Sequence, residues 1–190
     1  MQAVALQGKL RSFKGLMLDA DGVWFTGHEH RAVIDGKVAV MKTRHFHDGQ
    51  GLSFLRALGI KVVFATGEGE PLPDIVEKMN ALPSAQSGDW APVECFIGEF
   101  TKGGKVASLT AWLSKHGLTW SECAYIGDDR TDLEAMQKAG LKVAPADACR
   151  LVEKIADLTL SKNGGEGAIR EFAELVLDAR GIDEATLPAA

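Results

Sequence analysis

The chain has 190 residues, a formal net charge of -5, and a composition that is 46% hydrophobic and 25% charged. This length is enough for one compact domain, and the acidic balance argues against nucleic acid as a partner. No apolar run approaches the roughly 20 residues that span a bilayer, and the first residues lack the apolar core of a secretory signal. We therefore expect one cytoplasmic domain over 1–190 that contacts no membrane, with a frayed tail over 181–190.

Short apolar runs alternate with amphipathic segments of helical length along the chain. The expected strands are 15–19, 61–67, 93–98, 123–129, 140–146 and a short edge strand at 157–160. The expected helices are about 49–58, 72–80, 104–116, 131–138, 147–155 and 166–179. This alternation predicts an α/β fold, a Rossmann-like three-layer sandwich with a parallel sheet. Ligands bind such sheets at the carboxyl ends of the strands, where the strand order reverses.

One segment interrupts the alternation after Gly22. Asp35 and Gly36 are a strong two-residue hairpin signal, flanked by apolar and β-branched residues. We predict a β-hairpin flap over 28–46 that projects above the ligand-binding edge, and no other gap is long enough for an inserted cap domain. The segment 80–94 is predicted to be a loop, long enough to be functional or mobile.

Polar residues gather where three of the expected strands end. They are Asp19 and Asp21 after the first strand, Thr66 and Gly67 after the second, and Asp128 and Asp129 after the fourth. Paired carboxylates can bind a divalent cation, divide nucleophile and general-acid roles, or cap a turn. A turn alone does not explain two acidic clusters on one sheet, so a chemical site is favoured.

The motifs "DADGV", "ATG", a lysine and "YIGDDRTDLEAM" occur in this order over residues 16–146. In these motifs and their order the chain resembles the haloacid dehalogenase superfamily of phosphotransferases. The missing cap, the early hairpin and "GGEGAIREF" at 164–172 resemble its small capless sugar-acid phosphatases. The resemblance implies a single capless domain of that fold. It also implies hydrolysis of a sugar-acid phosphate with Mg²⁺ through an aspartyl-phosphate.

The resemblance also implies roles for individual residues. Asp19 would be the nucleophile, and Asp21 would protonate the leaving oxygen and then deprotonate the attacking water. Asp19, the backbone carbonyl of Asp21, and Asp128 would hold Mg²⁺. Thr66 and Gly67 would bind phosphate oxygens. Asp129 and Asp132 would orient the ligands or a lysine from behind.

Two lysines compete for the catalytic position, Lys102 and Lys105. In the resembling family the lysine lies at the start of a helix. Lys105 opens the apolar pattern of the segment 104–116, so Lys105 is the favoured candidate and Lys102 is expected to be a solvated loop residue.

Specificity is expected to depend on the residue after "TG", Glu68, and on His47 beside the flap. The resembling octulosonate 8-phosphate phosphatases usually carry arginine at the first position, whereas glutamate appears in phosphatases acting on nonulosonate 9-phosphates. "FHDGQG" at 46–51 looks more like the octulosonate branch, although His47 replaces its arginine. We favour a nonulosonate 9-phosphate (KDN or a sialic-acid relative), with 3-deoxy-octulosonate 8-phosphate as the alternative. The hairpin histidines are expected to be exposed polar residues rather than zinc ligands.

The hairpin is too apolar for a freely solvated flap. The resembling phosphatases are tetramers whose hairpins assemble together, so we predict a homotetramer. Two rival interpretations are a phosphorylated receiver domain and a non-catalytic assembly module. Receivers place the acidic pair and the phosphorylated aspartate in the reverse arrangement. A scaffold has no need to retain Asp19, Asp21, Thr66, Lys105 and Asp128 together.

Overall fold

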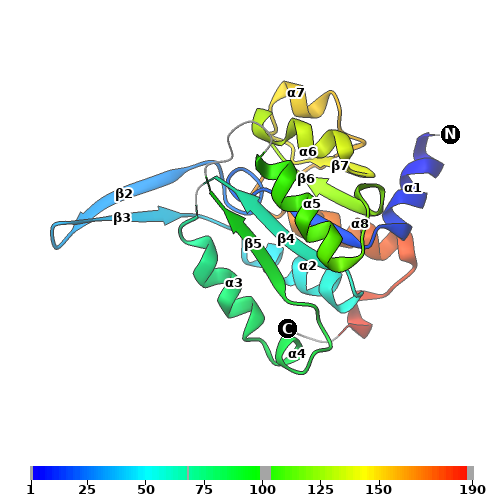
Figure 1. The fold of residues 1–190 in the computed structure, drawn as a ribbon, viewed down its shortest axis with the longest axis horizontal. Helices are drawn as coiled ribbons and strands as arrows, with labels where there is room; N and C mark the ends of the chain where they lie inside the picture. Colours follow the sequence, from blue (N-terminus) through cyan, green and yellow to red (C-terminus); the bar gives the residue numbers. More distant parts are fainter. Residues whose placement is uncertain (1, 68, 99–103, 188–190) are drawn as a thin grey trace.

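The centre of the molecule is a parallel sheet in the order β5-β4-β1-β6-β7-β8 (Figure 1). The computed structural model describes residues 2–67, 69–98 and 104–187. The strands are β1 Gly15–Leu18, β4 Lys61–Thr66, β5 Val93–Ile97, β6 Cys123–Ile126, β7 Leu141–Ala144 and β8 Leu158–Thr159. Every neighbouring pair in this sheet is parallel. The predicted α/β sandwich is confirmed, including the short edge strand.

Helices cover both faces of the sheet. They are α1 Gln2–Ser12, α2 Phe46–Ala57, α3 Leu72–Asn80, α4 Pro83–Gln86, α5 Gly104–His116, α6 Leu133–Lys138, α7 Arg150–Glu153 and α8 Ala168–Arg180. Leu18 and Phe64 share one apolar cluster with α1, α2, α3 and α8, whereas Met17 and Val63 share another with α5, α6 and α7. Successive strand residues thus face opposite layers. Because both layers are apolar, the strands read as continuous apolar runs in the sequence.

Several helix bounds differ from those expected from the sequence. The helices at 72–80 and 104–116 are confirmed, but α1 was not predicted. Helix α2 begins at Phe46 rather than near 49, because the side chain of His45 caps it by accepting the backbone N–H of His47. The segment 131–138 divides into a 3-10 turn, η2 Arg130–Asp132, and α6. Within the described ranges, no helix combines the length and apolarity that crossing a membrane requires.

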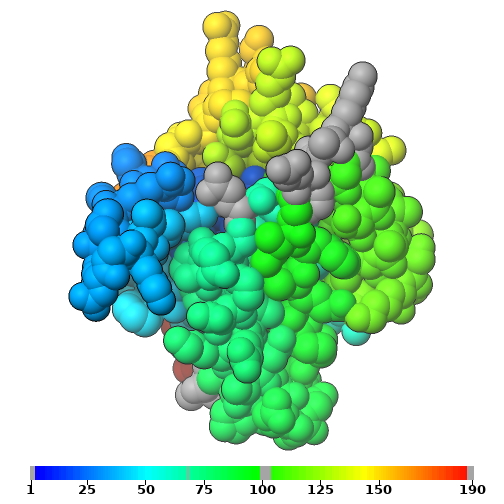
Figure 2. Space-filling model, turned by 60° about the vertical axis from the view of Figure 1, so that its left-hand side comes forward, coloured from blue at the N-terminus to red at the C-terminus, as the bar shows by residue number. Residues whose placement is uncertain are grey.

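The predicted hairpin is present as β2 Glu29–Ile34 and β3 Lys37–Lys42, which pair antiparallel. Asp35 and Gly36 both have positive φ, 49° and 74°, as a tight two-residue hairpin turn requires. The hairpin stands away from the body of the molecule in Figure 1, and in Figure 2 it is turned toward the viewer as the blue region at the left. Its apolar side chains are exposed, Val33 by 74% and Val38 by 66%.

The strand order reverses beside β1. Following the chain, β4 and β5 are added on one side of β1, and β6, β7 and β8 on the other. The carboxyl ends of β1 and β6 therefore flank the switch point, which is where parallel sheets bind ligands. These are the ends that carry Asp19 and Asp128.

The segment 80–94 contains structure that the sequence did not predict. Helix α4 lies within it, and Trp90 is buried with 3% exposure. Arg56 of α2, itself 1% exposed, donates hydrogen bonds to the carbonyls of Ala91 (3.0 Å) and Met79 (3.2 Å) and lies over the ring of Trp90. This segment is therefore tied to the body by a buried arginine.

We expect Arg56→Met to destabilise the fold, because it leaves two partly buried carbonyls without the arginine donor. Unpaired buried groups cost about 1–3 kcal/mol each, and these carbonyls are only partly buried, so a loss of about 2–4 kcal/mol is expected. In a domain of this size that lowers the melting temperature by about 5–15 °C. Thermal denaturation measures it, and Arg150→Met, at an exposed arginine, is the matched control. Equal melting temperatures for the two variants would contradict this stabilising role of Arg56.

Candidate functional site

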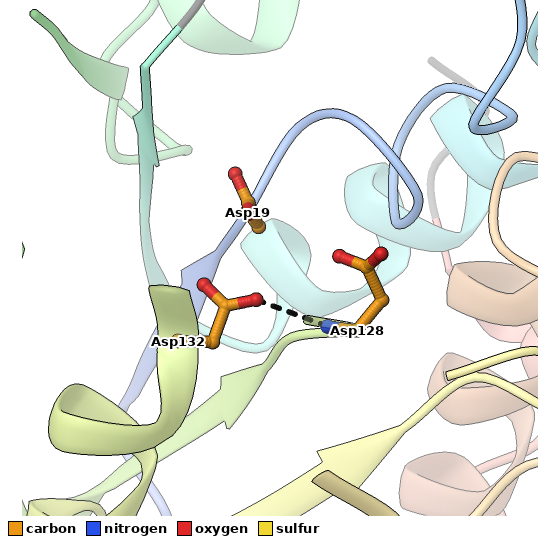
Figure 3. A group of neighbouring side chains, drawn as sticks. All are labelled: Asp19, Asp128 and Asp132. Atoms are coloured by element: carbon orange, nitrogen blue, oxygen red, sulfur yellow. Dashed lines mark hydrogen bonds between the residues drawn. The ribbon is translucent and has the colours of Figure 1, made fainter. Parts of the chain in front are cut away.

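Three carboxyl groups meet at the switch point of the sheet (Figure 3). Asp19 follows β1, Asp128 follows β6, and Asp132 ends η2. The backbone N–H of Asp19 donates to the carbonyl of Ile126 (3.1 Å), which joins the two strand ends. One carboxylate oxygen from each of the three aspartates lies within 4.8 Å of the others. The topology thus brings together residues more than a hundred positions apart.

Gly22 makes this approach feasible. Its φ is +80°, and a Cβ atom built there would lie 2.1 Å from Oδ2 of Asp128. Any other residue would be strained in this conformation and would collide with the carboxylate. The glycine of "DADG" therefore lets the loop after β1 close against the loop after β6.

Asp132 is a buried hydrogen-bond acceptor that contacts several other residues of the site. Its Oδ1 accepts hydrogen bonds from Lys105 Nζ (2.7 Å) and from the Tyr125 hydroxyl (2.8 Å). Its Oδ2 accepts from the backbone N–H groups of Asp128 (3.1 Å) and Asp129 (3.2 Å). With both oxygens engaged and no exposure, Asp132 is suited to orienting its neighbours.

Lys105 lies between two of the carboxylates. Its Nζ is 2.8 Å from Oδ2 of Asp19 and 2.7 Å from Oδ1 of Asp132, and its side chain is 7% exposed. Burial lowers the pKa of a lysine, but Asp132 and Asp19 outweigh it and raise the pKa of Lys105. Lys105 is therefore a buried, charged ammonium next to Asp19. Lys102, the competing lysine, lies outside the described residues.

The carboxylates are crowded. Burial first, and then Asp132, raises the pKa of Asp19 well above its ordinary value, with Lys105 acting in the opposite direction. Burial, Asp132 and Asp129 raise the pKa of Asp128 to about 7. Both shifts show that the protein alone does not compensate the negative charge here. A further cation in the site would remove this cost.

One open cavity of about 580 Å³ contains most of the predicted site residues. From the sheet it is lined by Asp19, Asp21, Thr66, Gly67, Lys105, Asp128 and Asp129. From the hairpin side it is lined by His28, Glu29, Arg31 and Lys42. Thr66 is 2% exposed at the end of β4. The flap therefore forms one wall of the cavity, as predicted.

One predicted substrate contact, His47, is not part of the described lining of this cavity. His47 lines a separate hollow of about 460 Å³, with His45 and residues at the start of α8, such as Arg170. Glu68 lies outside the described residues. The hairpin histidines do not converge as a group, since His30 is paired with Met41 across the hairpin.

Sequence reasoning missed two residues of the site, Lys42 and Tyr125. Lys42 reaches the carboxylate of Asp21 from the hairpin, and Tyr125 donates to Asp132 from within β6. A tyrosine in an apolar strand carries a hydroxyl that needs a partner when buried, and this is a usable signal. No local sequence pattern indicates that Lys42 contacts Asp21.

The cluster fits a divalent cation. Oδ1 of Asp128 is buried and has no hydrogen-bond partner among the described residues. Carboxylate oxygens are the ligands that hard cations such as Mg²⁺ prefer. Three observations agree with such an ion. One buried oxygen is unpaired, all the donors are oxygens, and the pKa values of the carboxylates are raised. Asp19 and Asp128 are thus the side chains suited to hold the ion.

Comparison with known proteins identifies the family. The family described as haloacid dehalogenase-like hydrolase matches residues 77–172. The 3-deoxy-D-manno-octulosonate 8-phosphate phosphatase KdsC of Haemophilus influenzae is 32% identical over 176 residues, which is 93% of this chain and 89% of that protein.

Solved structures agree with this match. The 3-deoxy-D-manno-octulosonate 8-phosphate phosphatase of Yersinia pestis superposes with a TM-score of 0.79 at 25% identity, over 93% of this chain and 87% of that one. The enzyme of the same name from Moraxella catarrhalis, in complex with magnesium, phosphate and KDO, gives a TM-score of 0.76 at 27% identity, over 93% and 92%. The chain therefore belongs to the haloacid dehalogenase-like hydrolases, as an enzyme of the phosphatase type found in these relatives.

Proposed function

We propose that the protein is a Mg²⁺-dependent phosphomonoesterase acting on 3-deoxy-D-manno-octulosonate 8-phosphate. Two observations together carry this proposal. The chain resembles phosphatases of that name over nearly its whole length, and its own cavity joins Asp19, Asp21, Thr66, Lys105 and Asp128. A non-catalytic assembly module would not need these five side chains in one cavity.

The relatives alter the substrate expected from the sequence. The sequence favoured a nonulosonate 9-phosphate because of Glu68. The relatives support the octulosonate alternative better, since the proteins from Haemophilus influenzae, Yersinia pestis and Moraxella catarrhalis are octulosonate 8-phosphate phosphatases by name and the last is a complex with KDO. Glu68 lies outside the described residues, so it adds no structural argument for the nine-carbon substrate. Glu68, Gly67 and His47 stay predicted substrate contacts.

Asp19, the backbone carbonyl of Asp21, and Asp128 would hold the Mg²⁺. When bound, the ion supplies positive charge to a transferring phosphoryl group and offsets the repulsion among the carboxylates. Asp132 and Asp129 would keep these groups in place from behind, as the hydrogen bonds of their backbone and side chains suggest.

The protein's own side chains account for the remaining steps. An oxygen of Asp19 attacks phosphorus, and the bond from phosphorus to the sugar oxygen breaks while Asp21 gives that oxygen a proton. Water then attacks the aspartyl-phosphate, Asp21 accepts its proton, and inorganic phosphate leaves with Asp19 restored. Lys105, Thr66 and the Gly67 amide would stabilise the charge on the phosphoryl oxygens.

The hairpin wall suits a substrate that carries a second negative charge. Arg31 and His28 line the mouth of the cavity beside the flap, and Arg31 is ion-paired with Glu29 of the same wall. A sugar acid presents a carboxylate in addition to its phosphate, and an arginine fork binds carboxylates well. A sugar carboxylate would thus take the place of Glu29 on Arg31, which supports a sugar acid over the phosphate ester of a neutral sugar.

Phosphate release from octulosonate 8-phosphate and from KDN 9-phosphate, both with Mg²⁺, tests the proposal. We expect kcat/KM for the octulosonate ester to be at least about 10-fold higher, as expected when one pocket discriminates two related ligands. A preference for the nine-carbon ester would restore the nonulosonate interpretation. Failure to hydrolyse either ester would refute the proposal. Glu68→Arg in the same assay measures the contribution of that residue.

Metal-free protein should lose stability as the pH rises. The pKa of Asp128 goes from 3.8 to about 7 on folding, so the folded state binds this proton more tightly than the unfolded chain does. Stability from this group is present below the unfolded pKa and declines as the pH rises toward the folded pKa. We expect the melting temperature in EDTA to fall between about pH 5 and about pH 8.

Mg²⁺ should reverse this decline, because the ion takes the place of the proton. At 100 times its dissociation constant a ligand adds about 2.7 kcal/mol, or about 5–10 °C for a domain of this size. The gain should be larger at the higher pH. Asp128→Asn is the control and should remove most of the Mg²⁺ effect. A Mg²⁺ effect that is unchanged in this variant would argue against the assigned ligand.

We also propose that the protein is a homotetramer assembled through the hairpin. Exposed apolar side chains on both hairpin strands support this, namely Val33, Ile34, Val38, Val40 and Met41. Such a surface suits a second copy of the same chain better than water. Light scattering at micromolar concentration tests it, and a monomer would contradict it. The unpaired state of Cys95, Cys123 and Cys149 agrees with the predicted cytoplasmic location.

A further inference from the structure

A buried lysine of the hairpin, Lys42, forms an ion pair with the carboxylate of Asp21. Nζ of Lys42 lies 2.7 Å from one oxygen of Asp21 and 2.8 Å from the other. The side chain of Lys42 is 3% exposed, whereas that of Asp21 is 36% exposed. The ammonium thus reaches Asp21 from the protein side, and the carboxylate keeps an open side. Both residues line the catalytic cavity.

The base of the hairpin is built to hold Lys42 in place. Lys42 is the last residue of β3, paired with Glu29 at the end of the hairpin nearest the sheet. The backbone N–H of Thr26 donates to the carbonyl of Thr43 (2.9 Å), which fastens this end to the loop after β1. The ammonium also lies 5.7 Å from the centre of the Phe25 ring. At the tip of the same hairpin, Lys37 is exposed.

We propose that Lys42 is a positioning residue for the acid-base role of Asp21, an inference that rests on the proposed phosphatase function. An ammonium that contacts both oxygens restricts rotation of the carboxyl group about its Cβ–Cγ bond. The exposed side of the Asp21 carboxylate then faces the cavity in one orientation. Proton transfer requires a heavy-atom approach of about 2.6–3.2 Å, so a freely rotating carboxyl group would be less effective. The flap thereby becomes part of the catalytic apparatus through Asp21.

This role has a consequence that a purely structural role lacks. The leaving oxygen of a sugar phosphate must be protonated as its bond to phosphorus breaks, whereas p-nitrophenolate leaves readily without a proton. Attack of water on the aspartyl-phosphate is common to all esters, whereas kcat/KM reports only the steps up to release of the leaving group. Loss of Lys42 should therefore lower kcat/KM for a sugar ester and hardly at all for p-nitrophenyl phosphate. A variant with a displaced flap or a damaged fold would lose kcat/KM on both esters alike.

The experiment measures kcat and KM of the full-length protein with Mg²⁺ for Lys42→Met, Lys42→Arg and Lys37→Met. The substrates are octulosonate 8-phosphate, phenyl phosphate and p-nitrophenyl phosphate. For Lys42→Met we expect kcat/KM on the sugar ester to fall about 10- to 100-fold, part of the range that a positioned acid contributes. The loss should be intermediate for phenyl phosphate and less than about 3-fold for p-nitrophenyl phosphate. Lys42→Arg should restore part of the loss, and Lys37→Met should match wild type on all three esters.

Two results would overturn the inference. One is an equal loss of kcat/KM on all three esters, which assigns Lys42 to the structure of the flap. The other is a rise in KM with unchanged kcat, which assigns it to substrate binding. If wild type hydrolyses the aryl esters but not octulosonate 8-phosphate, the proposed substrate fails on its own. The comparison of phenyl with p-nitrophenyl phosphate then still decides the role of Lys42. Melting temperatures of all variants show whether the fold is retained.

Discussion

Asp19→Asn is expected to abolish phosphate release, with kcat at least about a thousandfold below wild type, because it removes the covalent nucleophile. The carboxamide keeps the shape of the side chain but has no anionic oxygen to attack phosphorus. Asp19 is 7% exposed, and its Oδ1 accepts the backbone N–H of Ala20 at 2.7 Å. The amide oxygen of asparagine can accept that same bond, so the local structure should persist. Phosphate release with Mg²⁺ measures the loss.

The control for this variant is Asp89→Asn, which makes the same change at an exposed aspartate in the segment 80–94. It should match wild type in activity. Mass spectrometry after rapid acid quenching adds a second readout, since a phosphorylated protein should appear in wild type and be missing in Asp19→Asn. If Asp19→Asn kept activity within about 10-fold of wild type, the assignment of the nucleophile would be wrong.

Much of the site was predictable because strand ends are recognisable in the sequence. The apolar runs before Asp19 and Asp128 lie in β1 and β6, which pair directly. Once the strands are parallel, their carboxyl ends share one edge, so the two acidic clusters must meet. The hairpin was predictable for a local reason as well. A positive φ at both turn residues suits Asp35 and Gly36 and few other pairs.

The residues that sequence reasoning missed depend on contacts between distant segments. Nothing in the sequence near Lys42 shows that it pairs with Asp21, since this pair arises from the way the hairpin leaves the sheet. Arg56 lies in an amphipathic helix, where an arginine normally indicates the solvent side, yet it is 1% exposed because the carbonyls of Met79 and Ala91 accept its hydrogen bonds. Helix α1 has no strong apolar periodicity. It is held partly by a hydrogen bond from Arg11 to the carbonyl of Ala179.

The choice between Lys102 and Lys105 depends on both the sequence and the structure. The sequence favoured Lys105 from helical periodicity and family resemblance. In the structure Lys105 is in the first turn of α5 and lies between Asp19 and Asp132. This geometry supports the choice, and function remains its test.

Lys105→Met is expected to lower kcat about 100- to 1000-fold, the range seen when one preorganised charge donor is removed from a site. Methionine is of similar length but carries no charge, so the phosphoryl oxygens lose a fixed cation. Asp19 and Asp132 would then also lose the ammonium that lies between them. The matched controls are Lys115→Met, at an exposed lysine of the same helix that pairs with Glu94, and Lys102→Met. Both should stay close to wild type.

The pH dependence of Lys105→Met gives the sharper test. Burial and Asp132 raise the pKa of Asp19, and Lys105 lowers it. Without the lysine, the pKa of Asp19 rises further, so a larger share of the nucleophile is protonated at any acidic pH. The acid limb of the pH–rate profile should move to higher pH, and the defect should be larger at about pH 6 than at about pH 8. A defect of equal size at both pH values would mean that Lys105 does not govern the charge of Asp19. A defect in Lys102→Met instead would transfer the catalytic role to that residue.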